Sequence, residues 1–235
     1  LGLYFEYFPV NHLPVALLIC ALATWLASAF VPDIGTPMRQ PQSQSFLTIL
    51  RRRPVWLFFV AHFLLQLSHA PYYTFYSIYL EDHGYSRSDI GWLWGLGVLA
   101  EVVLFALMHR VLPAVGEHRL MLWSLAFAAL RWLMIGFGVD YPAIIWTAQL
   151  LHAASFATFH AAAMTLIYRH FGDGSQGQGQ AVYSMLWGTG VALGAWMVGM
   201  VWSVQMASLI FSMASGLCLI ALLLLLQPIR WVSWR

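Results

Sequence analysis

The feature that most constrains this sequence is its long apolar runs, which reach or exceed the length needed to cross a lipid bilayer. Residues 180–227 form one such run, about twice as long as the roughly 20 residues that a transmembrane helix needs. Of the 235 residues, 61% are hydrophobic and 9% are charged, whereas about a quarter of the residues in a soluble domain are charged. The apolar residues come in blocks rather than in the spaced pattern of a surface helix, so the predicted fold class is an all-α polytopic membrane protein.

Seven transmembrane helices are predicted, at residues 13–31, 55–80, 90–112, 119–138, 142–168, 180–203 and 205–227, with a Gly- and Gln-rich loop at 171–180. The longest polar segment is rich in Pro, Gln and Ser and ends on three arginines, which indicates a linker at the membrane surface. Four parts are predicted: a segment 1–31 that ends with a lone helix, a linker at 32–54, a six-helix bundle at 55–229 and a tail at 230–235. Because residue 1 is a leucine and no secretory leader follows it, we expect the chain to be a piece of a longer protein.

The basic residues lie almost all on one side of the predicted membrane. All eleven are arginines, and assigning the loops to alternating sides places nine together: Arg39, Arg51, Arg52, Arg53, Arg110, Arg119, Arg169, Arg230 and Arg235. The opposite side has Arg87, with the acidic residues Glu81, Asp82, Asp89 and Asp140. Because cytoplasmic loops carry the excess of positive charge, the linker and the C-terminus are predicted to be cytoplasmic.

Three consecutive predicted helices carry a charged or titratable residue near the middle of the membrane. Glu101 lies eleven residues, about 16 Å, from the helix end at Leu112, and Arg131 lies twelve residues, about 18 Å, from Arg119. His152 lies ten residues into the next helix from its outer end. An ionised side chain at the bilayer centre costs about 2.5–3.5 kcal/mol, so this shared layer predicts a proton-coupling site that also meets the charge of a substrate. The alternative is a structural ion pair between Glu101 and Arg131, although such pairs stabilise less than apolar packing.

Polar and aromatic residues also form stripes along two predicted helices. Steps of three and four residues join His62, Gln66, His69, Tyr73 and Tyr76 on helix 55–80, and Gln149, His152, Phe156 and His160 on helix 142–168. Lipid disfavours such faces, so they are predicted to face a water-filled cavity or, alternatively, a neighbouring helix. Together with Tyr72 and Trp94 as aromatic walls, these residues other than His152 are the predicted substrate-binding set.

The run FLLQLSHAPYYTFYSIYLEDHGYSRSDIGWLWGLGVLAEVVLF, with the later QLLHAASFATFHAAAM and AVYSMLWGTGVALG, resembles the second half of major facilitator superfamily proteins of the 3-phenylpropionate permease type. The resemblance covers about residues 50–225. It implies that helix 13–31 ends the N-terminal half, that 55–229 is the C-terminal six-helix bundle, and that the site lies where the two halves meet. More distantly, lactose permeases have a glutamate, an arginine and a histidine on the three helices that hold Glu101, Arg131 and His152. No second carboxylate lies near His152 here, so we expect its proton site to be organised differently.

The function implied by this resemblance is proton-coupled symport of a small organic molecule, such as an aromatic acid, in a bacterial inner (plasma) membrane. The implied partners are the substrate, protons, the lipid bilayer and the N-terminal half of the same protein; no cofactor, metal or nucleic acid is expected. The alternatives are a symporter for sugars or nucleosides, and a non-transporting signalling or assembly protein, against which the polar layer argues. An enzyme is not expected, because His152 and His160 are eight residues apart and no acidic residue joins them in a metal-like or catalytic set.

Overall fold

The regular structure of the chain is helical throughout the described residues. A computed structural model describes residues 12–30 and 45–227, so part of the predicted linker and the whole predicted tail lie outside the described residues. The elements are α2 (Leu13–Ser28), α3 (Phe46–Leu50), α4 (Arg53–Asp82), α5 (Arg87–Val115), α6 (Glu117–Gly138), α7 (Pro142–Gly199), the short 3-10 helix η2 (Val204–Met206) and α8 (Ala207–Leu226). The end of the predicted linker therefore forms the short helix α3 and the first turn of α4.

Five helices in the described ranges are long and apolar enough to cross a membrane. They are α5, α6, the segments Pro142–Gly172 and Ser175–Gly199 of α7, and the segment Val204–Leu226 that contains α8. These five correspond to the last five of the predicted transmembrane helices. The chain is an all-α polytopic membrane protein.

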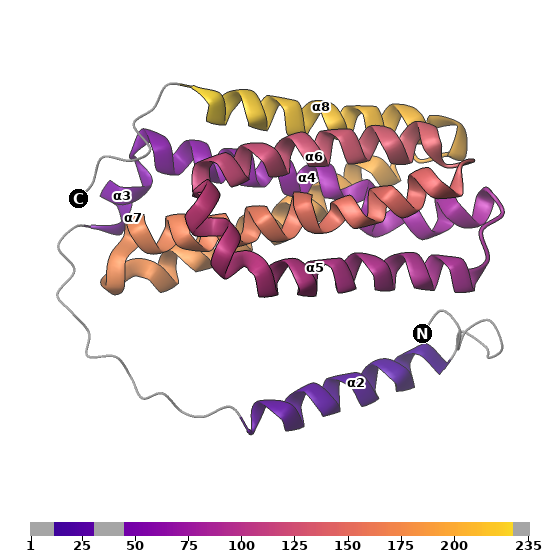
Figure 1. Cartoon of the computed structure of the whole chain (residues 1–235), viewed down its shortest axis with the longest axis horizontal. Helices are drawn as coiled ribbons and strands as arrows, with labels where there is room; N and C mark the ends of the chain where they lie inside the picture. Colours follow the sequence, from indigo (N-terminus) through magenta and orange to yellow (C-terminus); the bar gives the residue numbers. More distant parts are fainter. Residues whose placement is uncertain (1–11, 31–44, 228–235) are drawn as a thin grey trace.

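The long helix α7 is two helices joined by a sharp turn at Gly172. The backbone there has φ 59° and ψ −171°, a conformation that glycine adopts at little cost because it has no Cβ. Figure 1 shows the second limb folding back beside the first, at the end of the bundle where α3 lies. Toward this turn both limbs extend further than predicted, since the first reaches Gly172 and the second begins at Ser175, within the predicted loop. At its other end the second limb stops at Gly199, before the predicted residue 203.

The two remaining predicted transmembrane helices differ from this group for different reasons. Helix α2 has 16 residues, fewer than the roughly 20 that span a bilayer, and none of them is buried. Helix α4 has 30 residues, which is long enough, but its middle carries His62, Gln66 and His69. Those polar residues are tolerated because α4 packs inside the bundle, with sixteen of its residues buried against neighbouring helices.

The bundle is built around α4, α6 and the two limbs of α7. Helix α4 and helix α6 each pack against both α7 and α8, whereas α5 packs chiefly against α7 (Figure 1). One face of α5 therefore carries exposed apolar side chains, including Val98, Leu99, Val102 and Val103. The arrangement places the middle of α5 beside the first limb of α7. Glu101, Arg131 and His152, called the charged layer below, lie at this level.

Helix α4 and the second limb of α7 meet at their backbones. Gly190 and Gly194 are four residues apart, the spacing that lets transmembrane helices approach closely. A Cβ at Gly194 would lie 2.5 Å from the Cβ of Ala70 and 2.9 Å from the carbonyl oxygen of Leu67, so a side chain there would force the helices apart. This contact positions the polar face of α4 directly against α7.

The two ends of the bundle are tied by different polar contacts. At one end Arg53 donates to the side-chain oxygen of Gln227 at 2.7 Å, and Arg169 forms an ion pair with Glu117. At the other end Arg87 pairs with Glu81 at 3.3 Å. The arginines of the α4, α6 and α7 termini thus gather at one end, in agreement with the predicted alternation of the helices.

Candidate functional site

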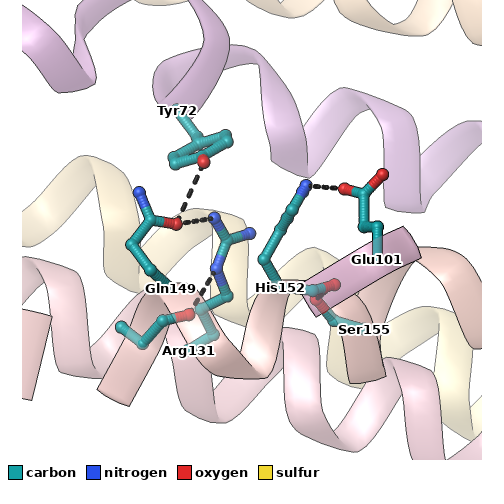
Figure 2. A network of polar contacts seen from close by, with 7 residues as sticks. Tyr72, Glu101, Arg131, Gln149, His152 and Ser155 are labelled. Atoms are coloured by element: carbon teal, nitrogen blue, oxygen red, sulfur yellow. Dashed lines mark hydrogen bonds and ion pairs between the residues drawn. The ribbon is translucent and has the colours of Figure 1, made fainter. Parts of the chain in front are cut away.

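Glu101 and His152 are in direct contact, which joins α5 to α7 in the middle of the bundle. Glu101 lies halfway along α5, and its carboxylate oxygen Oε1 lies 2.5 Å from Nε2 of His152 (Figure 2). His152 is 5% exposed, and the carboxylate side chain is 18% exposed. The predicted layer therefore contains a direct contact between the carboxylate and the imidazole, with the carboxylate reaching the bundle surface.

Arg131 lies fully buried on α6, next to this pair but not bonded to it. Its Nε donates to the backbone oxygen of Ala148 at 3.0 Å, and its Nη2 donates to Oε1 of Gln149 at 3.3 Å. The guanidinium also lies 4.1 Å from the ring centre of Tyr72 and 4.6 Å from that of Trp132, which are favourable cation–π geometries. Within the part of the chain that the structure describes, Arg131 thus forms no ion pair with a carboxylate, and Glu101 pairs with His152 instead.

Gln149 connects α4, α6 and α7 through one amide oxygen. That oxygen accepts both from Arg131 and from the Tyr72 hydroxyl, which lies 3.1 Å away (Figure 2). The amide orientation follows, because an atom that accepts from two donors must be the oxygen. Gln149 therefore presents its Nε2 donor in the opposite direction, one helical turn from His152.

Aromatic rings extend the site along the first limb of α7. The rings of His152, Phe156 and His160 are nearly parallel, with centroids 5.4 Å and 6.4 Å apart along the series. Trp187, from the second limb, meets Phe156 edge-on at 5.2 Å. The three rings of the predicted stripe on this helix thus form a stack beside Glu101.

The predicted stripe on α4 divides between the interior of the bundle and its surface. His62, Gln66 and His69 are buried, and His62 contacts Tyr183 on the second limb of α7 through a 3.1 Å hydrogen bond to its backbone oxygen. Their environment is a neighbouring helix, which was the alternative to an open cavity. Tyr73 is 36% exposed. The substrate-binding role of these residues stays a prediction.

The remaining aromatic residues of the predicted set lie together on the α5 side of α4. Tyr72 and Tyr76 are buried, with ring centroids 4.9 Å apart. Trp94 packs on Tyr72 at 4.6 Å and donates its Nε1 proton to Ser77 at 3.0 Å. Of these rings, Tyr72 lies 4.1 Å from the guanidinium of Arg131, so the aromatic cluster and the positive charge are neighbours.

Tyr183 is a component that the sequence did not single out. Its ring stacks on His62 at 3.8 Å, and its hydroxyl lies 3.1 Å from Nδ1 of His160. The sequence did contain an indication of this role. Tyr183 precedes Trp187 by four residues, and residues at that spacing share one face of a helix. It was missed because the partners lie on helices far away in the sequence.

Several buried polar atoms of this region have no hydrogen-bond partner among the described residues. They are Nδ1 of His62, Oε1 of Gln66, Nε2 of His69, the hydroxyl of Tyr76, Nη1 of Arg131, Nε2 of Gln149 and Nδ1 of His152. Buried polar groups are nearly always hydrogen-bonded, because leaving one unpaired is costly. The layer therefore has unused donors and acceptors that a bound group could satisfy.

An apolar cavity of about 480 Å³ lies outside this layer. It is lined by Leu50, Trp56, Phe59, Val60, Phe63, Val182 and Leu186, between α3, the first half of α4 and the second limb of α7. None of these side chains offers a charge or a hydrogen-bonding group to a polar ligand, apart from the indole of Trp56. This cavity therefore suits an apolar group and offers none of the charges of the layer.

Comparisons with known proteins agree with this architecture. The family described as "MFS_1 like family" matches residues 1–213. The chain is 34% identical over 177 residues to the "Probable 3-phenylpropionic acid transporter" of Escherichia coli (strain K12), a match that covers 71% of this chain and 46% of that protein. The chain thus spans about half the length of this curated relative, and no solved structure matches it. The predicted resemblance is confirmed: this chain belongs to the MFS_1 like family.

Proposed function

We propose that the full-length protein is a membrane transporter that carries a small organic acid together with a proton by alternating access. The observation that carries this proposal is the contact between Glu101 and His152 at the middle of the bundle. A carboxylate and an imidazole in contact can bind and release a proton between them. The rest of the protein supplies the opposing wall of the site, and the site opens to each side of the membrane in turn.

The charges of the layer explain why a proton and an organic anion travel together. Glu101 and Arg131 carry opposite charges, so the layer is neutral overall while His152 is neutral. A carboxylate substrate adds one negative charge and a proton adds one positive charge. Uncompensated charge is costly in a buried site, so each ligand favours the binding of the other, which is a coupling free energy between them.

Arg131 and its neighbours suit the carboxylate of the substrate. Nη1 of Arg131 and Nε2 of Gln149 are buried donors without a partner in the described chain, and donors of this kind bind carboxylates with charge-assisted hydrogen bonds. The rings of Tyr72, Tyr73 and Trp94 are close by, which suits an aromatic group attached to that carboxylate. The similarity to a protein named for 3-phenylpropionic acid supports the same substrate class.

The proton-coupled function predicts uptake that follows a pH gradient. We expect proteoliposomes with the full-length protein to accumulate labelled 3-phenylpropionate several-fold when the lumen is alkaline, and a protonophore to abolish this accumulation. Liposomes without protein correct for passive entry of the free acid. The neutral amide of the same compound should not compete, because it lacks the negative charge that Arg131 binds. Uptake that is indifferent to the pH gradient would contradict proton coupling, and absence of any protein-dependent uptake would favour the non-transporting alternative.

The arginine-rich end of the bundle is proposed to face the cytoplasm of a bacterium. We expect a single cysteine replacing Arg87 to react with a membrane-impermeant maleimide in intact cells, and one replacing Arg119 to react only after permeabilisation. Both positions are exposed, so their reactivity depends on the side of the membrane. Cys20 and Cys218 are first replaced by serine to remove the background. The opposite labelling pattern would invert the proposed orientation.

A further inference from the structure

The charged layer contains a second imidazole, that of His69 on α4. Its ring centroid lies 6.3 Å from that of His152 and 4.8 Å from Trp132, whose ring meets it edge-on. Nε2 of His69 and Nδ1 of His152 are both buried and have no partner in the described part of the chain. Two unused ring nitrogens thus belong to neighbouring side chains of the same layer.

The hydrogen bond on the other side of the His69 ring determines what Nε2 can do. Nδ1 of His69 lies 2.8 Å from the backbone oxygen of Leu65. A carbonyl oxygen only accepts, so Nδ1 must carry the proton. In the neutral ring Nε2 then has a lone pair, and His69 offers a buried acceptor.

The same reasoning applies to His152. Its Nε2 contacts the Glu101 carboxyl group at 2.5 Å. When Glu101 is ionised, its carboxylate only accepts, so Nε2 then carries a proton. In the neutral ring Nδ1 therefore has a lone pair. Without a further proton, the two histidines present acceptors to each other and cannot bond directly.

We propose that the transported proton binds Nδ1 of His152 and is shared with Nε2 of His69, an inference that rests on the proposed symport function. The proton adds to the lone pair of Nδ1, no other bond is broken, and the imidazolium is balanced by the Glu101 carboxylate. His152 then donates to Glu101 on α5 and to His69 on α4 at the same time. Proton binding thus ties α4, α5 and α7 together at the level of the substrate.

Other titratable groups around this position act on the bound proton. The groups near the two rings are Arg131 from α6, Glu101 from α5, and His62, Tyr72 and Tyr73 from α4. From α8, Cys218 bonds to Ser68, the residue before His69. Of these, Arg131 is the permanent cation, and it repels a proton on either ring. A substrate carboxylate at Arg131 relieves that repulsion, so the proton binds more firmly when the anion is present.

His69→Phe tests this inference because it retains an aromatic ring and removes the acceptor. In proteoliposomes of the full-length protein, we expect the pH of half-maximal proton-driven uptake of 3-phenylpropionate to fall by about one unit, since a hydrogen bond to a charged group contributes about that much binding free energy. Exchange of labelled for unlabelled substrate at equal pH should persist, since it needs no net proton movement. His69→Gln, which restores an acceptor oxygen near the position of Nε2, should return the midpoint toward that of the native protein.

The matched control is His109→Phe, at an exposed histidine that bonds only within α5, to the backbone of Ala106. It should leave the midpoint unchanged. If the pH of half-maximal uptake in His69→Phe equalled that of the native protein, the inference would be overturned. Loss of equilibrium exchange and of uptake by both His69 variants alike would also overturn it, because that result indicates a structural role.

A spectroscopic measurement separates this inference from the transport function. Nitrogen NMR of the full-length protein, labelled at histidine and embedded in lipid, should detect Nδ1 of His152 gaining a proton as the pH falls, with the signal identified by its loss in His152→Gln. This protonation should require a lower pH in His69→Phe. If the native protein showed no proton-driven uptake, the proposed function would fail while the NMR result would still decide the inference. An Nδ1 that does not titrate would overturn the inference even if symport is observed.

Discussion

Glu101→Gln is expected to abolish proton-driven accumulation of substrate while equilibrium exchange continues. The native Glu101 carboxyl group contacts His152 at 2.5 Å. The amide of the variant has nearly the same shape but no charge to balance an imidazolium on His152. Without that balance the site cannot take up its proton. A pH gradient of one unit sustains about a tenfold accumulation in a one-to-one symport of a proton and a monovalent anion. In the Glu101→Gln protein the ratio of internal to external substrate should therefore stay near one.

The control for this variant is Glu81→Gln, which removes a carboxylate from an exposed ion pair with Arg87. Exposed pairs contribute about 0–1 kcal/mol to stability, so this protein should accumulate substrate like the native one. Accumulation by Glu101→Gln that matched the native ratio across pH would exclude Glu101 from proton coupling. Loss of both accumulation and exchange would point to a collapsed site.

Arg131→Met is expected to cause the largest loss of substrate affinity. Arg131 uses Nε for Ala148, Nη2 for Gln149 and its flat face for Tyr72, which leaves Nη1 for the substrate. Removing one partner of a buried charge pair costs about 2–5 kcal/mol, so the dissociation constant for 3-phenylpropionate should rise by at least about 30-fold. Isothermal titration calorimetry of the purified full-length protein measures this change.

Arg131→Lys separates charge from geometry in this prediction. A lysine keeps the positive charge but cannot make three directed contacts at once, so its affinity should fall between those of the native protein and Arg131→Met. Circular dichroism and thermal melting establish that both variants are folded. Equal affinities of native and Met proteins would show that the substrate carboxylate binds elsewhere. A Lys variant as weak as the Met variant would assign Arg131 to orienting Gln149 and Tyr72 rather than to charge recognition.

The helices were predictable from the sequence because crossing a bilayer imposes a minimum apolar length. The five apolar helices from α5 to α8 agree with the predicted spans. Arg53 and Arg169 make their polar contacts at the same end of the bundle. The predicted and observed helices differ where neither apolar length nor hydropathy determines the structure. The turn at Gly172 depends on a single glycine conformation, and the polar middle of α4 is stable because neighbouring helices cover it.

The charged layer was predictable for a related reason. The rise per residue of an α-helix converts sequence position into depth, so Glu101, Arg131 and His152 could be placed at one level before their contacts were known. Which side chains would meet at that level could not be deduced, because it depends on the rotation of each helix and on its neighbours.

By itself, the sequence determined the membrane fold, the order of the helices, the depth of the charged residues and the family resemblance. Only the tertiary structure decided that Glu101 bonds to His152, and that Arg131 is held by Gln149 and by the backbone of Ala148. It also decided that His69 bonds through Nδ1 to Leu65 and keeps a buried Nε2 without a partner among the described residues. The physical reason is that depth follows from residue count along one helix, whereas pairing follows from side-chain packing between helices.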